Sequence, residues 1–127
     1  MKLCIAMTHA NTNVYRREYL QRSLITLPRE LPLFVNIEPE ANYASNDILN
    51  IFPLANIQNN KQKLGCATNI FTVLMRCYEA DYDTVWLTDD DVIHSKDAIN
   101  LIKWWSKTEL YKKCIAFCLG STIGFGI

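Results

Sequence analysis

The sequence predicts an α/β domain in which a mostly parallel sheet is flanked by helices, a three-layer arrangement. Short, nearly continuous apolar runs alternate along the chain with segments whose apolar residues recur at helical spacing. Apolar runs of this kind are typical of parallel strands buried on both faces. With 127 residues, of which 50% are hydrophobic, the chain fits a single domain over residues 1–127.

The first part of the chain predicts a strand, a helix and a second strand. The strands are expected at residues 2–7 and 33–37, where apolar residues run almost without interruption. Between them, residues 15–27 predict a helix, which Pro28 ends. The apolar face of this helix consists of Leu20, Leu24 and Leu27. Its polar surface is expected to include Arg16, Arg17 and Arg22.

The segment from Glu38 to Lys63 is rich in asparagine and contains Pro39 and Pro53. Such composition favours turns and irregular structure. We therefore predict a long functional loop, with at most a short strand around Ile51 and Phe52.

Regular elements are expected again in the second half of the sequence. Residues 68–78 carry one apolar stripe and predict a helix that begins near Gly65 and Thr68. Residues 84–88 combine β-branched and aromatic side chains and predict a buried strand. A helix over residues 96–107, with Ser95 as its N-cap, and a last strand over residues 114–119 complete the prediction.

Charge and cysteine content limit the classes of function. Thirteen basic residues balance thirteen acidic ones, and no basic run points to nucleic acid or an anionic membrane. The five cysteines lack the paired spacing of a disulfide framework or a zinc site, which favours reduced thiols and a cytoplasmic location. No stretch has the length of a membrane span. An apolar tail predicts contact with a second copy or a partner chain, through Ile123, Phe125 and Ile127.

Three consecutive aspartates, Asp89, Asp90 and Asp91, directly follow the strand expected at residues 84–88. In an open parallel sheet, the loops that leave the carboxyl ends of the strands line the ligand crevice. Adjacent carboxylates repel one another, so a hard divalent cation such as Mg²⁺ or Mn²⁺ would stabilise them. Alternate side chains of an extended segment share a side, so Asp89 and Asp91 are expected to converge on the metal while Asp90 turns elsewhere. The alternative is a solvated turn that begins the next helix.

Residues 82–92 (YDTVWLTDDDV) resemble the DxD motif and preceding strand of glycosyltransferases of the GT-A fold. Residues 5–11 and 19–24 are similar to the opening strand and first helix of that family, and residues 64–69 to the glycine-containing start of the helix before the DxD strand. The resemblance implies a Rossmann-like, nucleotide-binding half that binds a UDP-sugar or GDP-sugar with Mn²⁺ or Mg²⁺.

The resemblance also implies roles for individual residues. Thr8 and Glu38 would contact the nucleoside, although many relatives have aspartate where Glu38 stands. Asn69 would lie near the ribose or diphosphate, Asp89 would meet the ribose or metal, and Asp91 would bind the metal. The nucleotide-sugar site expected in this way comprises Thr8, Glu38, Gly65, Asn69, Asp89 and Asp90, with Asp89 and Asp91 as metal ligands.

Members of that family continue into an acceptor-binding half that supplies the catalytic base of inverting enzymes. After Asp91 the only acidic residues are Asp97 and Glu109, both expected on helices, so residues 1–127 are interpreted as the donor-binding half without the acceptor half. The sequence identifies no catalytic residue, sugar or acceptor. It leaves two functions open: sugar transfer, and a non-catalytic module that binds a nucleotide or a partner.

Other reaction classes fit the sequence less well. A haloacid-dehalogenase phosphatase also uses DxD, but its motif opens the fold and needs later lysine and acidic residues. A receiver-type regulatory domain gathers acidic residues from two strand ends, whereas the first strand here ends in Thr8 and His9. A glycine-rich dinucleotide or P-loop motif is absent, because Gly65 is the only glycine before Gly120.

Overall fold

The computed structural model describes residues 1–113. The chain consists of two compact units, Met1–Ile93 and His94–Ile127. The first unit contains four strands and three helices in the order β1, α1, β2, α2, β3, α3 and β4. In the second unit, the described residues contain α4 (Ala98–Trp105) and α5 (Glu109–Lys113). The strand expected at residues 114–119 and the apolar tail lie outside the described residues.

The sheet of the first unit is parallel throughout. Its strands are β1 (Leu3–His9), β2 (Leu33–Ile37), β3 (Asn56–Asn59) and β4 (Thr84–Thr88). They lie in the order β3-β2-β1-β4. His9 pairs with Ile37, Ile37 with Asn59, and Met7 with Thr88, so the carboxyl ends of all four strands meet at one edge. This arrangement confirms the predicted α/β fold class.

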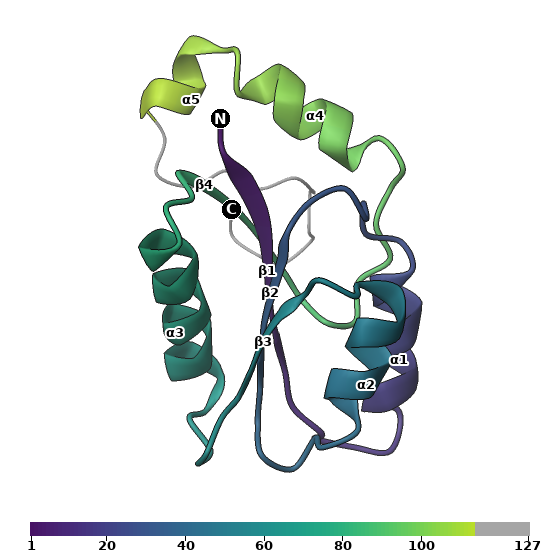
Figure 1. Cartoon of the computed structure of the whole chain (residues 1–127). Coiled ribbons are helices and arrows are strands. Elements are labelled where there is room, and N and C mark those ends of the chain that lie inside the picture. Colours follow the sequence, from purple (N-terminus) through teal and green to yellow (C-terminus); the bar gives the residue numbers. More distant parts are fainter. Residues whose placement is uncertain (114–127) are drawn as a thin grey trace. The chain divides into compact units, whose positions relative to one another are not determined.

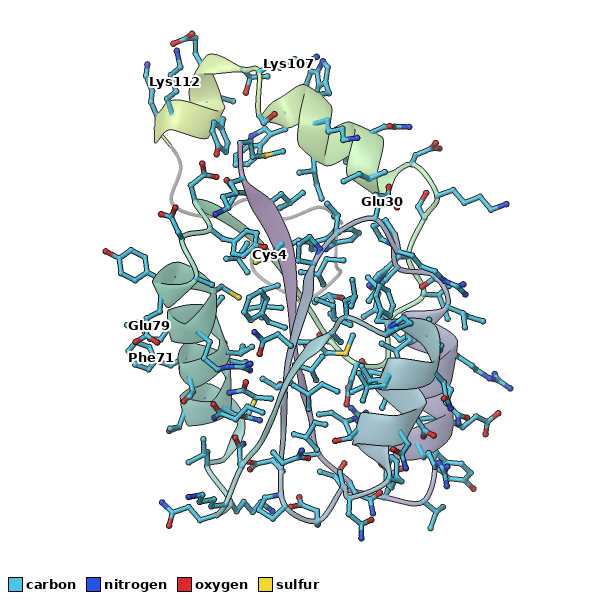
Figure 2. The ribbon with its side chains drawn as sticks, viewed as in Figure 1. Cys4, Glu30, Phe71, Glu79, Lys107 and Lys112 are labelled. Atoms are coloured by element: carbon cyan, nitrogen blue, oxygen red, sulfur yellow. The ribbon has the colours of Figure 1, made fainter. Side chains whose placement is uncertain are left out.

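Helices cover both faces of this sheet (Figure 1). Helix α3 (Cys66–Glu79) packs against β1 and β2 on one face, while α1 (Arg16–Leu24) and α2 (Ala44–Ile51) pack together on the other. Part of the core lies between the sheet and α3, where buried residues of both cluster. These residues are Cys4, Ala6, Phe34, Val73 and Cys77. Figure 2 shows Cys4 inside this layer, while Phe71 and Glu79 project outward from α3.

The long loop expected between Glu38 and Lys63 is a wrong prediction, because this segment contains α2 and β3. Three buried apolar residues of the segment recur at helical spacing, but polar residues surround them in the sequence. They are Ala44, Ile48 and Phe52. Strand β3 has the polar sequence NIQN and contains no buried residue. It ends the strand order, and an edge strand needs less apolar character than a central one.

Strand β4 forms over the predicted residues, but it is less buried than expected. Only Trp86 is buried, and Leu87 is 44% exposed. In the order of the described strands, β4 lies at the opposite end from β3, next to β1.

Helix bounds differ from the predictions mainly at the termini. Helix α1 ends at Leu24 rather than Leu27, although Leu27 is buried as predicted. Helix α4 is shorter than expected and follows Asp97, whose N–H donates to the Ser95 hydroxyl at 3.2 Å. Of the two adjacent tryptophans, Trp105 is buried and Trp104 is exposed. Within residues 1–113, no helix is both long and apolar enough to cross a membrane.

The cysteines of the first unit should differ in reactivity. Cys66 is exposed, whereas Cys4 and Cys77 are buried and hydrogen-bonded to each other. That hydrogen bond, with burial, raises the pKa of the Cys4 thiol well above its ordinary range. In native protein, a disulfide reagent should therefore label Cys66 quickly and Cys4 only on unfolding. Peptide mapping by mass spectrometry would test this, and equal labelling of Cys4 and Cys66 would contradict it.

Candidate functional site

The candidate site lies at the carboxyl edge of the sheet, between the two strands where the order of strand addition reverses. Strands β2 and β3 follow β1 on one side, and the chain then returns to place β4 on the other side of β1. The position between β1 and β4 is therefore the topological switch point, the usual ligand position in open α/β sheets. His9 ends β1 there, and Asp89, Asp90 and Asp91 directly follow β4.

Asp90 is the buried member of the three aspartates, with 5% of its surface exposed. One carboxylate oxygen lies 2.6 Å from His9 Nδ1, and the other accepts a hydrogen bond from Arg16 Nη2. Because a carboxylate accepts, the proton of a neutral His9 is assigned to Nδ1. Asp90 is thus a buried charge compensated by a guanidinium and an imidazole.

His9 connects Asp90 to Tyr43, which lies just before α2. The imidazole is fully buried, and its Nε2 lies 2.7 Å from the Tyr43 hydroxyl. That hydroxyl is also 3.4 Å from the Asn11 side-chain oxygen. Burial and the negative charges of Asp90 and Asp47 raise the pKa of Tyr43. Tyr43 is therefore a neutral phenol that orients His9 from the loop after β2.

Arg16 bridges two of the aspartates. Besides contacting Asp90, it donates from Nη1 to Asp91 at 3.1 Å, and its side chain is only 18% exposed. The expectation that Arg16 belongs to the polar surface of its helix is therefore wrong. Arg22 does lie on that surface, paired with Glu18 at 2.6 Å. We call His9, Arg16, Tyr43, Asp90 and Asp91 the Asp90 cluster.

Asp89 differs from its two neighbours, because within residues 1–113 its exposed carboxylate has no hydrogen-bond or ion-pair partner. Partial desolvation raises its pKa, and the charges of Asp91 and Asp90 act in the same direction. A cation placed near Asp89 would relieve this repulsion. The described residues contain no group of three or more histidine, cysteine or acidic side chains that would hold a metal by itself.

A second set of sequence-predicted residues meets at the carboxyl ends of β2 and β3. Glu38 is 3% exposed and accepts hydrogen bonds from Asn60 at 2.7 Å and from the N–H groups of Leu64 and Gly65, each at 3.0 Å. Asn60 also donates to the Asn69 side chain at 2.9 Å. We call Glu38, Asn60, Leu64, Gly65 and Asn69 the Glu38 cluster.

The Glu38 cluster fixes the start of α3. Gly65 is the N-cap and has φ of 80°, a conformation that glycine adopts without strain. The Glu38 carboxylate therefore holds the two N–H groups that lead into the helix. The structure brings Glu38, Gly65 and Asn69 together, and their polar groups take part in hydrogen bonds within the Glu38 cluster. Thr8 belongs to neither cluster among the described residues, and it lies half-buried beside Asn36.

Stability should depend on the charge of Glu38. Burial alone would raise its pKa, but the hydrogen bonds from Asn60, Gly65 and Leu64 outweigh burial and lower the pKa below that of an ordinary glutamate. Its contribution to stability should be complete above that ordinary pKa and should be lost as pH falls through the lowered pKa. Urea unfolding between pH 6 and pH 3 should show a steeper loss for the wild type than for Glu38→Gln; parallel curves would contradict this.

Arg16, Tyr43 and Asn60 were not predicted as site residues. Tyr43 and Asn60 lie in the segment interpreted as a loop, and Arg16 was placed on a helix surface. Only Arg16 had a signal in the sequence, its position at the start of a predicted helix, because the elements beside Tyr43 and Asn60 were not predicted. Lys61 and Lys63 are exposed, and Lys63 Nζ lies 4.0 Å from the Glu40 carboxylate. His94 begins the second unit, and burial lowers the pKa of its imidazole.

Comparison with known proteins adds no family. No family model matches the sequence, and neither the curated proteins nor the solved structures include a match. The function must therefore be argued from the site.

Proposed function

We propose that this chain binds a nucleotide-sugar at the carboxyl edge of its sheet, through a divalent cation held by Asp89 and Asp91, and transfers the sugar to an acceptor. One observation carries the proposal: the three aspartates follow β4 at the switch point beside β1. Two of them, Asp89 and Asp91, are exposed there, while Asp90 is buried in the Asp90 cluster.

The chemistry of these oxygens fits Mg²⁺ or Mn²⁺. Mg²⁺ typically takes one or two protein carboxylates and completes its coordination with substrate phosphates and water. Two exposed aspartates therefore suit a cation that arrives with a diphosphate better than a cation held by protein alone. When bound, such a cation would neutralise charge that develops on the leaving nucleoside diphosphate.

Hydrogen bonds within the protein limit the residues that we assign to nucleotide contact. Asp90 and Glu38 already have their hydrogen-bonding capacity engaged by His9, Arg16, Asn60 and backbone N–H groups. We therefore assign them to holding the loops of the site, and assign ligand contact to Asp89, Asp91 and Thr8. The acceptor remains unassigned.

Because the Glu38 carboxylate is already hydrogen-bonded within the Glu38 cluster, a second function is also considered. In that function the chain binds a nucleotide or a partner without transferring a sugar. Glu38 is the residue expected at the nucleoside, and its carboxylate accepts from Asn60 and two backbone groups. Release of free nucleotide from a UDP-sugar or GDP-sugar, lost in Asp89→Asn, would support transfer. Metal-dependent binding without any release would support the module.

Location and assembly complete the proposal. We place the chain in the cytoplasm, because its cysteines lack the spacing of a disulfide framework. We also propose that a second copy or a partner chain contacts the apolar tail, which sedimentation would test; a clean monomer would contradict self-association.

Calorimetric titration with UDP and GDP in the presence of Mn²⁺ tests donor binding. We expect binding that a chelator abolishes and that Asp89→Asn and Asp91→Asn each weaken about tenfold or more. Asp81→Asn is the matched control, because it removes a carboxylate at the other end of β4, where the side chain is 97% exposed. Asparagine also tolerates the φ of 68° found there. Absence of binding to folded wild type would contradict the proposal.

A further inference from the structure

The inference concerns Arg16, whose guanidinium faces two carboxylates with different surroundings. Nη2 donates to Asp90, which is 7% exposed in its side chain and also contacts His9. Nη1 donates at 3.1 Å to Asp91, whose side chain is 44% exposed. Arg16 is thus anchored on its buried side and held by a single hydrogen bond on its accessible side.

A metal ion on Asp91 would compete with Arg16 for the same carboxylate. Two cations on one carboxylate repel each other strongly, and one guanidinium cannot neutralise three aspartates. The Nη1 contact to Asp91 is the weaker of the two, because solvent screens an exposed ion pair. The contact to Asp90 is shielded from solvent and would persist. Arg16 would then stay beside the metal with Nη1 free to donate.

We propose, on the basis of the function proposed above, that Arg16 is a ligand-binding residue that exchanges partners when the nucleotide binds. In the free protein its Nη1 holds Asp91. With a cation and a nucleotide bound, Asp91 would bind the cation and Arg16 Nη1 would donate to a phosphate oxygen, while Nη2 would remain on Asp90. The guanidinium suits this exchange, because its five N–H donors lie in a fixed fork. Its Nε is buried and has no partner within residues 1–113, so its donor capacity is not exhausted.

Partner exchange predicts opposite effects on two affinities. Removing the guanidinium frees Asp91 from a competing cation, so the affinity for Mn²⁺ alone should rise, about threefold for a partly exposed ion pair. The affinity for UDP at saturating Mn²⁺ should fall about tenfold, because a charge-assisted hydrogen bond to phosphate is lost. A merely structural role for Arg16 would lower both affinities together.

The test compares Asp90→Asn with the double variant Arg16→Gln and Asp90→Asn. The Asp90→Asn background is needed because Arg16→Gln alone would leave a buried carboxylate without its guanidinium and would destabilise the fold. Mn²⁺ binding is measured by electron paramagnetic resonance of the free ion, and UDP binding by calorimetry. Arg22→Gln in the same background is the charge-matched control, because Arg22 pairs with Glu18 on the surface of α1.

A rise in Mn²⁺ affinity with a fall in UDP affinity, both unique to Arg16→Gln, would support partner exchange. Unchanged affinities, or two affinities that fall together, would overturn it while leaving the proposed donor site intact. If neither the background protein nor the double variant binds Mn²⁺ or UDP, and wild type does not either, both the donor site and the exchange are wrong.

Discussion

Replacing Arg16 with methionine is expected to lower the free energy of unfolding by about 3 kcal/mol. Asp90 is 5% exposed, and Arg16 is its guanidinium partner. Without the guanidinium, the carboxylate would remain buried with only the His9 imidazole beside it. Removing one partner of a buried pair costs far more than the pair contributes, because the remaining charge stays desolvated. Urea unfolding followed by circular dichroism measures this difference.

Two further variants identify the cause of that loss. Arg22→Met removes a guanidinium whose side chain is 66% exposed, so its effect should stay below about 1 kcal/mol. Adding Asp90→Asn to Arg16→Met should recover part of the lost stability, because no buried charge is then left. Equal losses for Arg16→Met and Arg22→Met, or strict additivity with Asp90→Asn, would show that Arg16 and Asp90 are not a coupled buried pair.

Glu38→Gln is expected to lower the free energy of unfolding by about 2 kcal/mol, the scale of a charged hydrogen-bond acceptor lost from a buried site. The wild-type carboxylate accepts from Asn60 and from the N–H groups of Leu64 and Gly65. An amide in its place would turn an NH₂ group toward at least one of these donors. A buried donor would then lack an acceptor at the start of α3, and the loss should appear in urea unfolding at pH 7.

Glu40→Gln is the matched control for this change, two residues further along the chain. Its carboxylate lies 4.0 Å from Lys63 and is 33% exposed, so the substitution should cost less than about 1 kcal/mol. Hydrogen exchange gives a second measurement, because protection of the first turn of α3 should fall in Glu38→Gln and not in Glu40→Gln. Equal stability of the two variants would mean that Glu38 does not secure this helix start.

The three aspartates differ in how far protein groups neutralise their charges. Considered alone, three adjacent carboxylates suggest a cation that neutralises all of them. In the folded chain, protein groups already compensate Asp90 fully and Asp91 in part, through His9 and Arg16. The unmet negative charge is concentrated on Asp89 and the exposed side of Asp91. A cation that binds there needs further oxygen ligands, which a diphosphate supplies.

The sequence predicted the elements whose signal is local. Strands β1 and β2 are mostly apolar runs, and α3 carries an apolar stripe, because each buries a large apolar surface. The sequence predicts strand β4 from its β-branched and aromatic residues. The missed elements, α2 and β3, consist largely of polar residues, so composition favoured a loop.

By itself, the sequence determined that the three aspartates follow a strand and therefore lie at the carboxyl edge of a parallel sheet. Only the tertiary structure decided which of the three carboxylates are paired with other protein groups. His9 and Asp90 are 81 positions apart, and Arg16 and Asp90 are 74 apart. Their contact requires β4 to return beside β1 in one register, with α1 beginning at the same edge. Such pairing follows from packing of the whole sheet, which no local pattern of residues encodes.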